Sequence, residues 1–448
     1  MSSYDVIVVG AATTGAVAAK KLSQKGYKVL MVDAKPRNRI GDKACGDAIG
    51  EEDLRKAGVD LPKQVIRERI QGADLYSPDE KTVFRVKGYG FTVDRIGLGR
   101  ALVEEAEAAG VVFLDNFRVE GPLLRDGRVV GVRGRDEVQS RVVLDASGNK
   151  TRLRGAMPDA WLIEKAVTRS DAVAAFRVEL KNPQPSVESG YLKIYFDQKT
   201  SPGGYIWAFP EGDMANIGVG VTMIGSYPNP KTKTYEWIAR KGIRGEEVVA
   251  SGDTVPTRRP MANMVGNGIV FAGDAAMTVN PVTGGGIGSG MISASMAAST
   301  IASALESKDL PGFAELWDYN MTYMKEYGVK QAGLDVFRRF LIHLSNDDIN
   351  FGMSSGMMDE ESVTKAALTG TVDISWKKEF EIVLAGLRRP SMLLRLRQMS
   401  QDVARAMDLY SRYPSDFGGL ALWKQQADSF FSSLGYRGSS QVSISSAG

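Results

Sequence analysis

The stretch from Tyr4 to Gly15 constrains the fold of this chain more than any other. A run of apolar and β-branched residues, Val6 to Val9, enters a turn with the pattern Gly10-x-Ala12-x-x-Gly15. The next residues are rich in Ala, Lys and Leu, which predicts a helix, and a second predicted strand, 28–32, ends in Asp33. This order indicates a βαβ unit that opens on a dinucleotide.

The residues that such a unit needs to bind a dinucleotide are present here. Gly10 allows a tight turn, and Gly15 lets the helix lie close to the sheet. The start of the helix offers free N–H groups and a positive dipole end to a pyrophosphate. Asp33 is placed to accept hydrogen bonds from a ribose hydroxyl. The alternative is an ordinary βαβ turn, and the acid at the expected distance favours the dinucleotide.

Composition excludes several other classes of function. The chain has one cysteine, Cys45, so it has no intrachain disulfide, and one histidine, His343, so we expect no metal site built on histidines. A net charge of +3 over 448 residues gives no argument for nucleic acid. No apolar run approaches the roughly 18 residues that span a bilayer. We therefore expect a cytoplasmic protein without a signal peptide.

The pattern along the chain predicts an α/β protein in which a Rossmann-like domain is interrupted by a second domain. Residues 1–170 would form the first part of the nucleotide-binding domain, with a short strand insertion near 65–92. Residues 171–255 alternate strands and turns and predict an antiparallel-sheet domain. The chain then returns to the first domain over 256–305, and a mainly helical region follows over 306–437. Residues 438–448 are rich in Gly and Ser and predict a disordered tail.

Two later motifs indicate which dinucleotide the chain binds. Asp145-Ala146-Ser147-Gly148 ends a predicted strand, and Gly273-Asp274 ends another before the glycine-rich stretch 284–288. With the first motif, they resemble the FAD-binding group typified by the aromatic hydroxylases. The resemblance implies that FAD is bound. The residues implied to hold it are Gly10, Gly15, Asp33, Arg95, Arg100, Val119, Asp274, Gly286 and Ile287.

Two further stretches resemble the geranylgeranyl reductases. One is the loop Lys43 to Ala48, and the other is Pro202-x-x-Tyr205-x-Trp207-x-Phe209-Pro210, which is followed by Gly218-x-Gly220. The resemblance implies an FAD-dependent enzyme that saturates C=C bonds of geranylgeranyl chains in archaeal-type membrane lipid precursors. It also implies that Cys45, Gly46 and Ala48 lie in a loop over the flavin.

Three alternatives to this function stay open from the sequence. One is a flavin-dependent aromatic monooxygenase of the same fold. Another is a reductase of geranylgeranyl diphosphate or of a chlorophyll-type prenyl chain, and the third is a flavin-binding lipid carrier that catalyses nothing. The chain has no second dinucleotide motif, so both ferredoxin and NAD(P)H stay open as electron donors, as does the oligomeric state.

The aromatic strand suits an isoprenoid substrate. Side chains alternate along a strand, so Tyr205, Trp207 and Phe209 point to one face and can line an apolar tunnel. The alternative is an aromatic stripe in an ordinary sheet core. Large rings would also stabilise a carbocation.

An isolated alkene is not electrophilic, so hydride addition at one carbon needs a proton at the other. Cys45 is a candidate proton donor because a thiol is mostly protonated at neutral pH. Tyr205 is a rival donor, and a small buried thiol without a catalytic role is the alternative for Cys45.

The last helical stretch begins at Pro390. Its apolar residues recur every three or four positions, and residues 386–412 hold six arginines against two aspartates. Such a helix suits contact with anionic lipid headgroups at the inner membrane face. The alternative is a core-facing helix with a solvated basic side.

Overall fold

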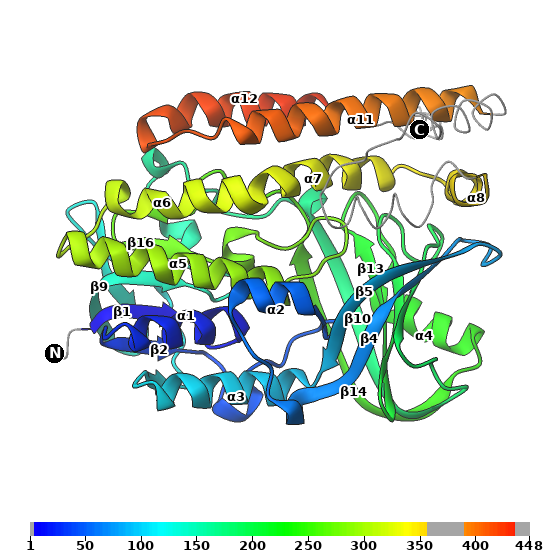
Figure 1. Cartoon of the computed structure of the whole chain (residues 1–448), viewed down its shortest axis with the longest axis horizontal. Coiled ribbons are helices and arrows are strands. Elements are labelled where there is room, and N and C mark those ends of the chain that lie inside the picture. Colours follow the sequence, from blue (N-terminus) through cyan, green and yellow to red (C-terminus); the bar gives the residue numbers. More distant parts are fainter. Residues whose placement is uncertain (1–3, 356–388, 435–448) are drawn as a thin grey trace, which may run out of the picture.

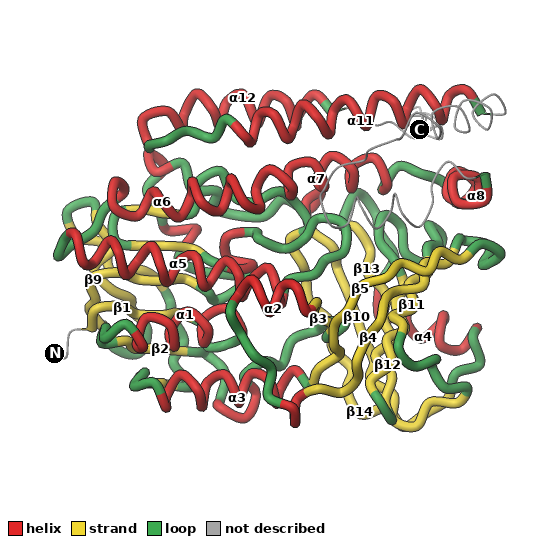
Figure 2. The backbone as a smooth tube through the Cα atoms, viewed as in Figure 1, coloured by secondary structure: helices red, strands yellow, loops and turns green. Residues whose placement is uncertain are grey.

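The computed structural model describes residues 4–355 and 389–434, and these form two sheets and a helical layer (Figures 1 and 2). In Figure 1 the first sheet lies on the left, the second sheet on the right, and the C-terminal helices extend along the top across both. The predicted α/β fold with an antiparallel second sheet and a helical C-terminal region is confirmed for the described residues.

The first sheet has the order β15-β16-β9-β1-β2-β6, with the hairpin β7–β8 attached to β9. Neighbours from β16 to β6 run parallel, and β15 is antiparallel to β16. The strands are β1 (Tyr4–Val9), β2 (Val29–Val32), β6 (Val112–Leu114), β7 (Gly121–Arg125), β8 (Arg128–Arg133), β9 (Glu137–Asp145), β15 (Val265–Gly266) and β16 (Ile269–Phe271). The apolar runs of β1, β2 and β9 are buried because helices and loops cover both faces of a parallel sheet.

Helix α1 (Thr13–Gln24) packs against α3 (Arg95–Ala108) and the long helix α5 (Ile287–Ser307), and α5 also contacts the short helix α2 (Glu51–Ala57). The small residues of α5, among them Ala294, Ala297 and Ala298, are buried and let it approach its neighbours closely. The carboxyl ends of β1, β2, β9 and β16 therefore meet at one edge, where open α/β sheets bind ligands.

The second sheet has the order β14-β10-β13-β12-β11-β4-β5-β3 and is antiparallel except between β11 and β4. Its strands are β3 (Ala48–Gly50), β4 (Ile66–Tyr76), β5 (Val83–Val93), β10 (Ala172–Gln184), β11 (Tyr191–Tyr195), β12 (Ile206–Glu211), β13 (Met214–Thr222) and β14 (Arg244–Pro256). Helix α4 (Pro230–Arg240), which the sequence analysis did not predict, packs on β10 and β13.

One feature corrects the expected organisation. The strands expected as an insertion near 65–92 are β4 and β5, and they complete the second sheet instead of belonging to the first. The pairing of Gly72 to Tyr76 with Tyr191 to Tyr195 joins them to it. The second sheet is thus built from two separate parts of the chain, one before and one after the strands of the hairpin β7–β8.

The C-terminal helices lie over both sheets (Figure 1). They are α6 (Phe313–Tyr323), α7 (Val329–Leu341), α8 (Asn346–Ser354), α11 (Pro390–Ser411) and α12 (Leu420–Ser433), with a π-helical turn, Met324–Gly328, between α6 and α7. Pro390 is the first residue of α11, as predicted, and the buried Met392, Met399 and Val403 lie on this helix, which packs on α7. The expected disordered tail lies outside the described residues.

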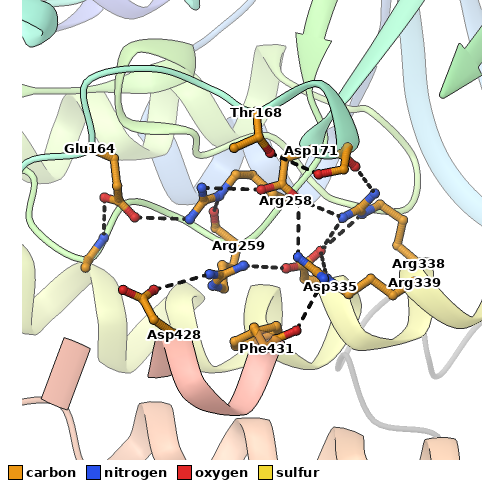
Figure 3. A network of polar contacts seen from close by, with 12 residues as sticks. Glu164, Thr168, Asp171, Arg258, Arg259, Asp335, Arg338, Arg339, Asp428 and Phe431 are labelled. Atoms are coloured by element: carbon orange, nitrogen blue, oxygen red, sulfur yellow. Dashed lines mark hydrogen bonds and ion pairs between the residues drawn. The ribbon is translucent and has the colours of Figure 1, made fainter. Parts of the chain in front are cut away.

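A buried ionic network holds the helical layer to the rest of the molecule (Figure 3). Asp335 of α7 is fully buried and accepts hydrogen bonds from Arg338 at 2.8 Å and from Arg259 at 3.2 Å. Asp171, beside the start of β10, lies 3.5 Å from Arg258 and 3.3 Å from Arg338. The network therefore fixes the position of α7 against the segments that join the two sheets.

No helix in residues 4–355 or 389–434 is long and apolar enough to cross a membrane.

Candidate active site

A cavity of about 1180 Å³ lies between the carboxyl edge of the first sheet, the inner face of the second sheet and the C-terminal helices. Its lining includes the turn after β1, the loop 41–47, the glycine-rich loop before α5 and the aromatic strand β12. It continues between the apolar face of the second sheet and helices α7, α8 and α11.

The β1–α1 turn is as tight as its glycines suggested. Gly10 has φ +98°, and a Cβ on it would lie 2.5 Å from the carbonyl oxygen of Ala146. A Cβ on Gly15 would lie 1.7 Å from the oxygen of Gly10. Asp33 accepts hydrogen bonds from the backbone N–H groups of Ala11 and Lys35, both at 2.8 Å. These bonds hold its carboxylate at the cavity edge.

Two helices begin at the cavity without a capping side chain. Neither α1, preceded by Ala12, nor α5, preceded by Gly286, has a side chain that accepts from its first N–H groups. Both helix starts line the cavity. Uncapped N–H groups at two helix starts suit a ligand with an anionic pyrophosphate.

Asp274 follows β16 and forms an ion pair with Lys43 of the loop 41–47. Burial lowers the pKa of Lys43, but Asp274, Asp253 and Cys45 together raise it, so the pKa lies above its ordinary value and Lys43 stays charged. The ion pair joins the glycine-rich side of the site to the loop that carries Cys45.

Most of the predicted cofactor residues lie at this cavity, and two do not. Cys45, Gly46, Ala48, Arg95, Val119, Asp274, Gly286 and Ile287 line it together with Gly10 and Asp33. Gly15 lies behind the turn, where its role is packing. Arg100 is exposed and does not line the cavity, in contrast to what the resemblance implied. It follows Arg95 by five residues, which is about 140° around a helix, so the two arginines point in different directions.

The loop with Cys45 is held against the aromatic strand. The thiol sulfur accepts from the backbone N–H of Asp47 at 3.3 Å, and the carbonyl of Cys45 accepts from Asn216 Nδ2 at 3.0 Å. A Cβ on Gly46 would lie 2.6 Å from the ring of Phe209. Burial raises the pKa of the Cys45 thiol, and the neighbouring Asp47 carboxylate raises it further. The thiol is therefore protonated at neutral pH.

Tyr205, which directly precedes β12, and Trp207 and Phe209 of β12 all line the cavity, as alternation predicts. Tyr205 donates its hydroxyl hydrogen to the carbonyl of Thr283, in the glycine-rich loop. Trp207 Nε1 donates to Oδ1 of Asn216 at 2.9 Å. Burial raises the pKa of the Tyr205 phenol, and Cys45 raises it further, so this phenol is a weaker acid than an exposed tyrosine.

Beyond the aromatic strand the cavity becomes an apolar tunnel. One wall is the inner face of the second sheet, and the other is formed by α7, α8 and α11. Side chains that line these walls include Leu75, Phe84, Leu192, Ile194, Leu334, Phe337, Met353, Met392 and Leu396. Methionines in such a lining adapt to a flexible apolar chain.

Sequence reasoning missed a set of polar residues behind the aromatic strand: Asp47, Arg177, Glu211 and Asn216. All four are buried. A signal for two of them exists in the sequence, because Asn216 interrupts a strand that is otherwise apolar or small, and Arg177 directly follows the apolar run Ala172 to Phe176. A polar residue in a buried strand needs a partner, and here the partners are one another.

Comparison with known proteins agrees with this geometry. The family model of the geranylgeranyl reductase catalytic domain matches residues 171–254. A digeranylgeranylglycerophospholipid reductase of Sulfolobus acidocaldarius is 39% identical over 95% of this chain and 96% of that protein. The chain belongs to the digeranylgeranylglycerophospholipid reductase family. A second member of this family, from Methanothrix thermoacetophila, is 30% identical over 83% of the chain and 95% of its own length.

Solved structures share the fold at lower identity. A geranylgeranyl bacteriochlorophyll reductase-like protein from Thermoplasma acidophilum superposes with a TM-score of 0.75 at 24% identity, over 89% of this chain and all of that one. A myxobacterial chondrochloren halogenase, described as a variant of FAD-dependent halogenases, gives a TM-score of 0.63 at 19% identity, over 92% of this chain and 97% of that one. The digeranylgeranylglycerophospholipid reductase family thus shares its architecture with FAD-dependent enzymes of other chemistry.

Proposed function

We propose that this protein is an FAD-dependent reductase that saturates the C=C bonds of the geranylgeranyl chains in digeranylgeranylglycerophospholipids. The observation that carries the proposal is the continuity of one cavity. It joins a dinucleotide-binding edge to an apolar tunnel, with a protonated thiol between them. Membership of the family supplies the substrate class.

The residues at the carboxyl edge of the first sheet suit FAD. The uncapped starts of α1 and α5 would hold the pyrophosphate, and Asp33 would accept from the adenosine ribose. Asp274, Gly286 and Ile287 would contact the ribityl chain and the flavin. When bound and reduced, FAD supplies the hydride.

The aromatic strand and the tunnel would hold the isoprenoid chain. Tyr205, Trp207 and Phe209 present their rings to the cavity, where they exclude water and stabilise positive charge that develops on the alkene. The apolar walls beyond them suit a long hydrocarbon, since burial of apolar surface contributes about 25 cal/mol per Å².

Cys45 would deliver the proton. Its thiol lines the cavity and keeps its hydrogen at neutral pH, whereas the hydroxyl of Tyr205 is engaged with the carbonyl of Thr283. Because the hydroxyl hydrogen of Tyr205 is held by a backbone carbonyl, Cys45 is the better donor of the two.

Contact with a membrane surface would bring the lipid to the tunnel. On α11, Leu394 is 67% exposed and lies one turn before the exposed Arg397, so an apolar and a basic side chain share one outer face. Sedimentation with anionic vesicles, compared between the wild type and Leu394→Ser/Arg397→Ser, tests this contact. Equal binding of both proteins would contradict it.

The central experiment is anaerobic. The purified protein is reduced with dithionite and mixed with an unsaturated digeranylgeranylglycerophospholipid, and the lipid is analysed by mass spectrometry. We expect mass gains of two hydrogens per saturated bond, with concomitant reoxidation of the flavin. An unchanged lipid, with flavin that stays reduced until O₂ enters, would instead favour the monooxygenase.

The physiological electron donor is tested in the same assay. Dithionite is replaced by reduced ferredoxin or by NADPH, and the rate of flavin reduction is measured. The sequence leaves both donors open, so the donor that reduces the flavin faster is assigned as the physiological one. The alternative substrate, free geranylgeranyl diphosphate, is tested in the same assay in place of the phospholipid, and the two rates of C=C saturation are compared.

A further inference from the structure

A cluster of buried charged groups lies directly behind Cys45. It comprises Asp47 of the cysteine loop, Arg95 of α3, Arg177 of β10 and Glu211 of β12, and none of these residues is more than 6% exposed. Among the residues that the structure describes, Glu211 makes no hydrogen bond to Asp47 but lies within reach of its charge. Asp47 and Arg95 line the cavity, and the proposed chemistry has so far given no role to Asp47, Arg177 or Glu211.

Asp47 is the centre of this cluster. Its Oδ2 accepts from Arg177 Nη1 at 2.9 Å and from Asn216 Nδ2 at 3.1 Å, and Arg95 Nε lies 3.4 Å from its Oδ1. Arg177 also forms an ion pair with Glu179. Since Asn216 also bonds the carbonyl of Cys45, one amide fixes the carboxylate and the cysteine loop together.

Several polar atoms of the cluster have no hydrogen-bond partner within the described part of the chain. They are Asp47 Oδ1, Arg95 Nε and Nη1, Arg177 Nε and Glu211 Oε1. Buried polar atoms are normally paired, so unpaired atoms gathered in one place indicate bound water or a functional role.

The two carboxyl groups of the cluster suit proton exchange near neutral pH. Burial raises the pKa of Asp47 to about 6 against the opposing effect of Arg177 and Arg95. Burial also raises the pKa of Glu211 to about 8, and the charge of Asp47 adds to the rise. Glu211 therefore holds a proton at pH 7. Asp47 lies next to the thiol, since its backbone N–H donates to Cys45 Sγ at 3.3 Å.

We propose that Asp47 and Glu211 return a proton to Cys45 after each C=C bond is reduced, and that Asn216 positions Asp47 for this transfer. The inference rests on the proposed function. In each cycle the alkene takes a hydride from the reduced flavin and the S–H proton of Cys45, which leaves a thiolate. The thiolate takes a proton from the acid form of Asp47, Asp47 takes one from Glu211, and Glu211 is reprotonated by water.

The charged groups that face the three members act on them in known directions. Arg95 and Lys43 lower the pKa of Cys45, and Asp94 raises that of Asp47. Arg177 and Arg67 lower the pKa of Glu211. Removing the charge of Asp47 must therefore lower the pKa of the thiol, because a neighbouring negative charge disfavours the thiolate.

The test uses the single cysteine of the full-length protein. Alkylation by iodoacetamide reports on Cys45 alone, and its rate is measured from pH 6 to pH 10 without substrate. We expect Asp47→Asn to shift the midpoint down by about one pH unit and Glu211→Gln to shift it less, in the same direction. Asp53→Asn serves as the control, because Asp53 lines the same cavity but does not contact the cluster, and we expect it to leave the midpoint unchanged.

A second measurement, the number of bonds saturated per active site, distinguishes the return of a proton to Cys45 from a role of Asp47 and Glu211 in positioning the loop. In Asp47→Asn and Glu211→Gln, the dithionite-reduced enzyme should saturate about one bond per active site at the wild-type rate, and later bonds at least ten-fold more slowly. Steady saturation at the wild-type rate in both variants would overturn the inference, as would unshifted thiol titrations. If the wild type itself saturates no bond, the proposed function fails. The thiol titration is run without substrate, so it still tests whether Asp47 and Glu211 act on Cys45.

Discussion

Gly15 lies so close to Gly10 that a Cβ on Gly15 would stand 1.7 Å from the carbonyl oxygen of Gly10. The start of α1 therefore has its position only because residue 15 has no side chain. We expect Gly15→Val to push the helix away from the turn and to abolish FAD binding, because the pyrophosphate site depends on that helix start. The flavin absorbance of the purified variant measures this effect.

The matched control is Gly155→Ala. A Cβ at this exposed glycine meets no atom within 4 Å. We expect full flavin occupancy and an unchanged melting temperature. Full occupancy in Gly15→Val would contradict the role given to the β1–α1 turn.

Replacement of Cys45 should separate cofactor binding from turnover. Cys45→Ala removes the proposed proton donor but only shortens a side chain at the cavity wall, so we expect FAD to remain bound. Reoxidation of reduced flavin by the lipid should fall at least 100-fold, which is typical of the loss of a general acid. Stopped-flow absorbance under anaerobic conditions measures both quantities.

Tyr205→Phe is the comparison for this variant. It removes the hydroxyl that donates to Thr283 and keeps the ring. We expect its rate to stay within about ten-fold of the wild type, since the loss of a general acid costs 10² or more. A larger loss in Tyr205→Phe than in Cys45→Ala would assign the proton to the phenol.

Local sequence signals predicted the parts of the fold that local interactions determine. The βαβ unit and the start of α11 at Pro390 both follow from periodicity, glycine or proline over short windows. The place of β4 in the second sheet depends instead on its pairing with β11, more than 100 residues later, and no local pattern encodes that partner.

The site divides in the same way. Positions where the backbone itself forms the site, such as Gly10 and Gly286, could be predicted from motifs, because glycine lets the backbone approach a ligand closely. Arg100 came only from the resemblance, and the rotation along α3 carries it away from the cavity. The partnership of Asp47 with Asn216 was not predictable, because 169 residues separate them and only the fold brings them to 3.1 Å.

The tunnel gives a prediction about substrate length. Ile194 lies on β11, lines the cavity and pairs with Trp207 across the sheet. We expect Ile194→Trp to fill part of the tunnel, so that saturation of full geranylgeranyl chains slows at least ten-fold while flavin content is unchanged. Val248→Trp, on the outer strand β14 and outside the cavity lining, is the control and should behave as the wild type. Equal rates for both variants would contradict a chain path along β11.

The network in Figure 3 predicts a stability effect far from the chemistry. Asp335→Asn leaves the guanidinium groups of Arg338 and Arg259 buried without their shared carboxylate. Breaking a buried pair in this way costs about 3–5 kcal/mol of unfolding free energy. The control is Asp408→Asn, which breaks an exposed pair with Arg412 and should cost less than about 1 kcal/mol. Denaturant titration compares the two, and equal losses would show that the network does not hold α7.

Glu211 gives the molecule a pH dependence of stability with a definite sign. Its pKa rises from 4.5 to about 8 in the folded protein because it is buried. Between these values the folded protein binds a proton that the unfolded chain has lost, so the contribution of Glu211 to stability is fully present below about pH 4.5 and is lost as pH rises toward 8.

Glu211→Gln tests this contribution, because glutamine has similar shape and no charge at any pH. We expect the variant to match the wild type near pH 5 and to exceed it at pH 8.5, by an amount on the order of a few kcal/mol. Thermal unfolding from pH 5 to pH 8.5 measures the two curves. Asp47 is unchanged in the variant. Its contribution to protein stability, which is lost between about pH 4 and 6, should therefore be the same in the wild type and the variant. Parallel curves between pH 6 and 8.5 would mean that Glu211 is already ionised in the folded protein, and would remove it as the proton source for Asp47.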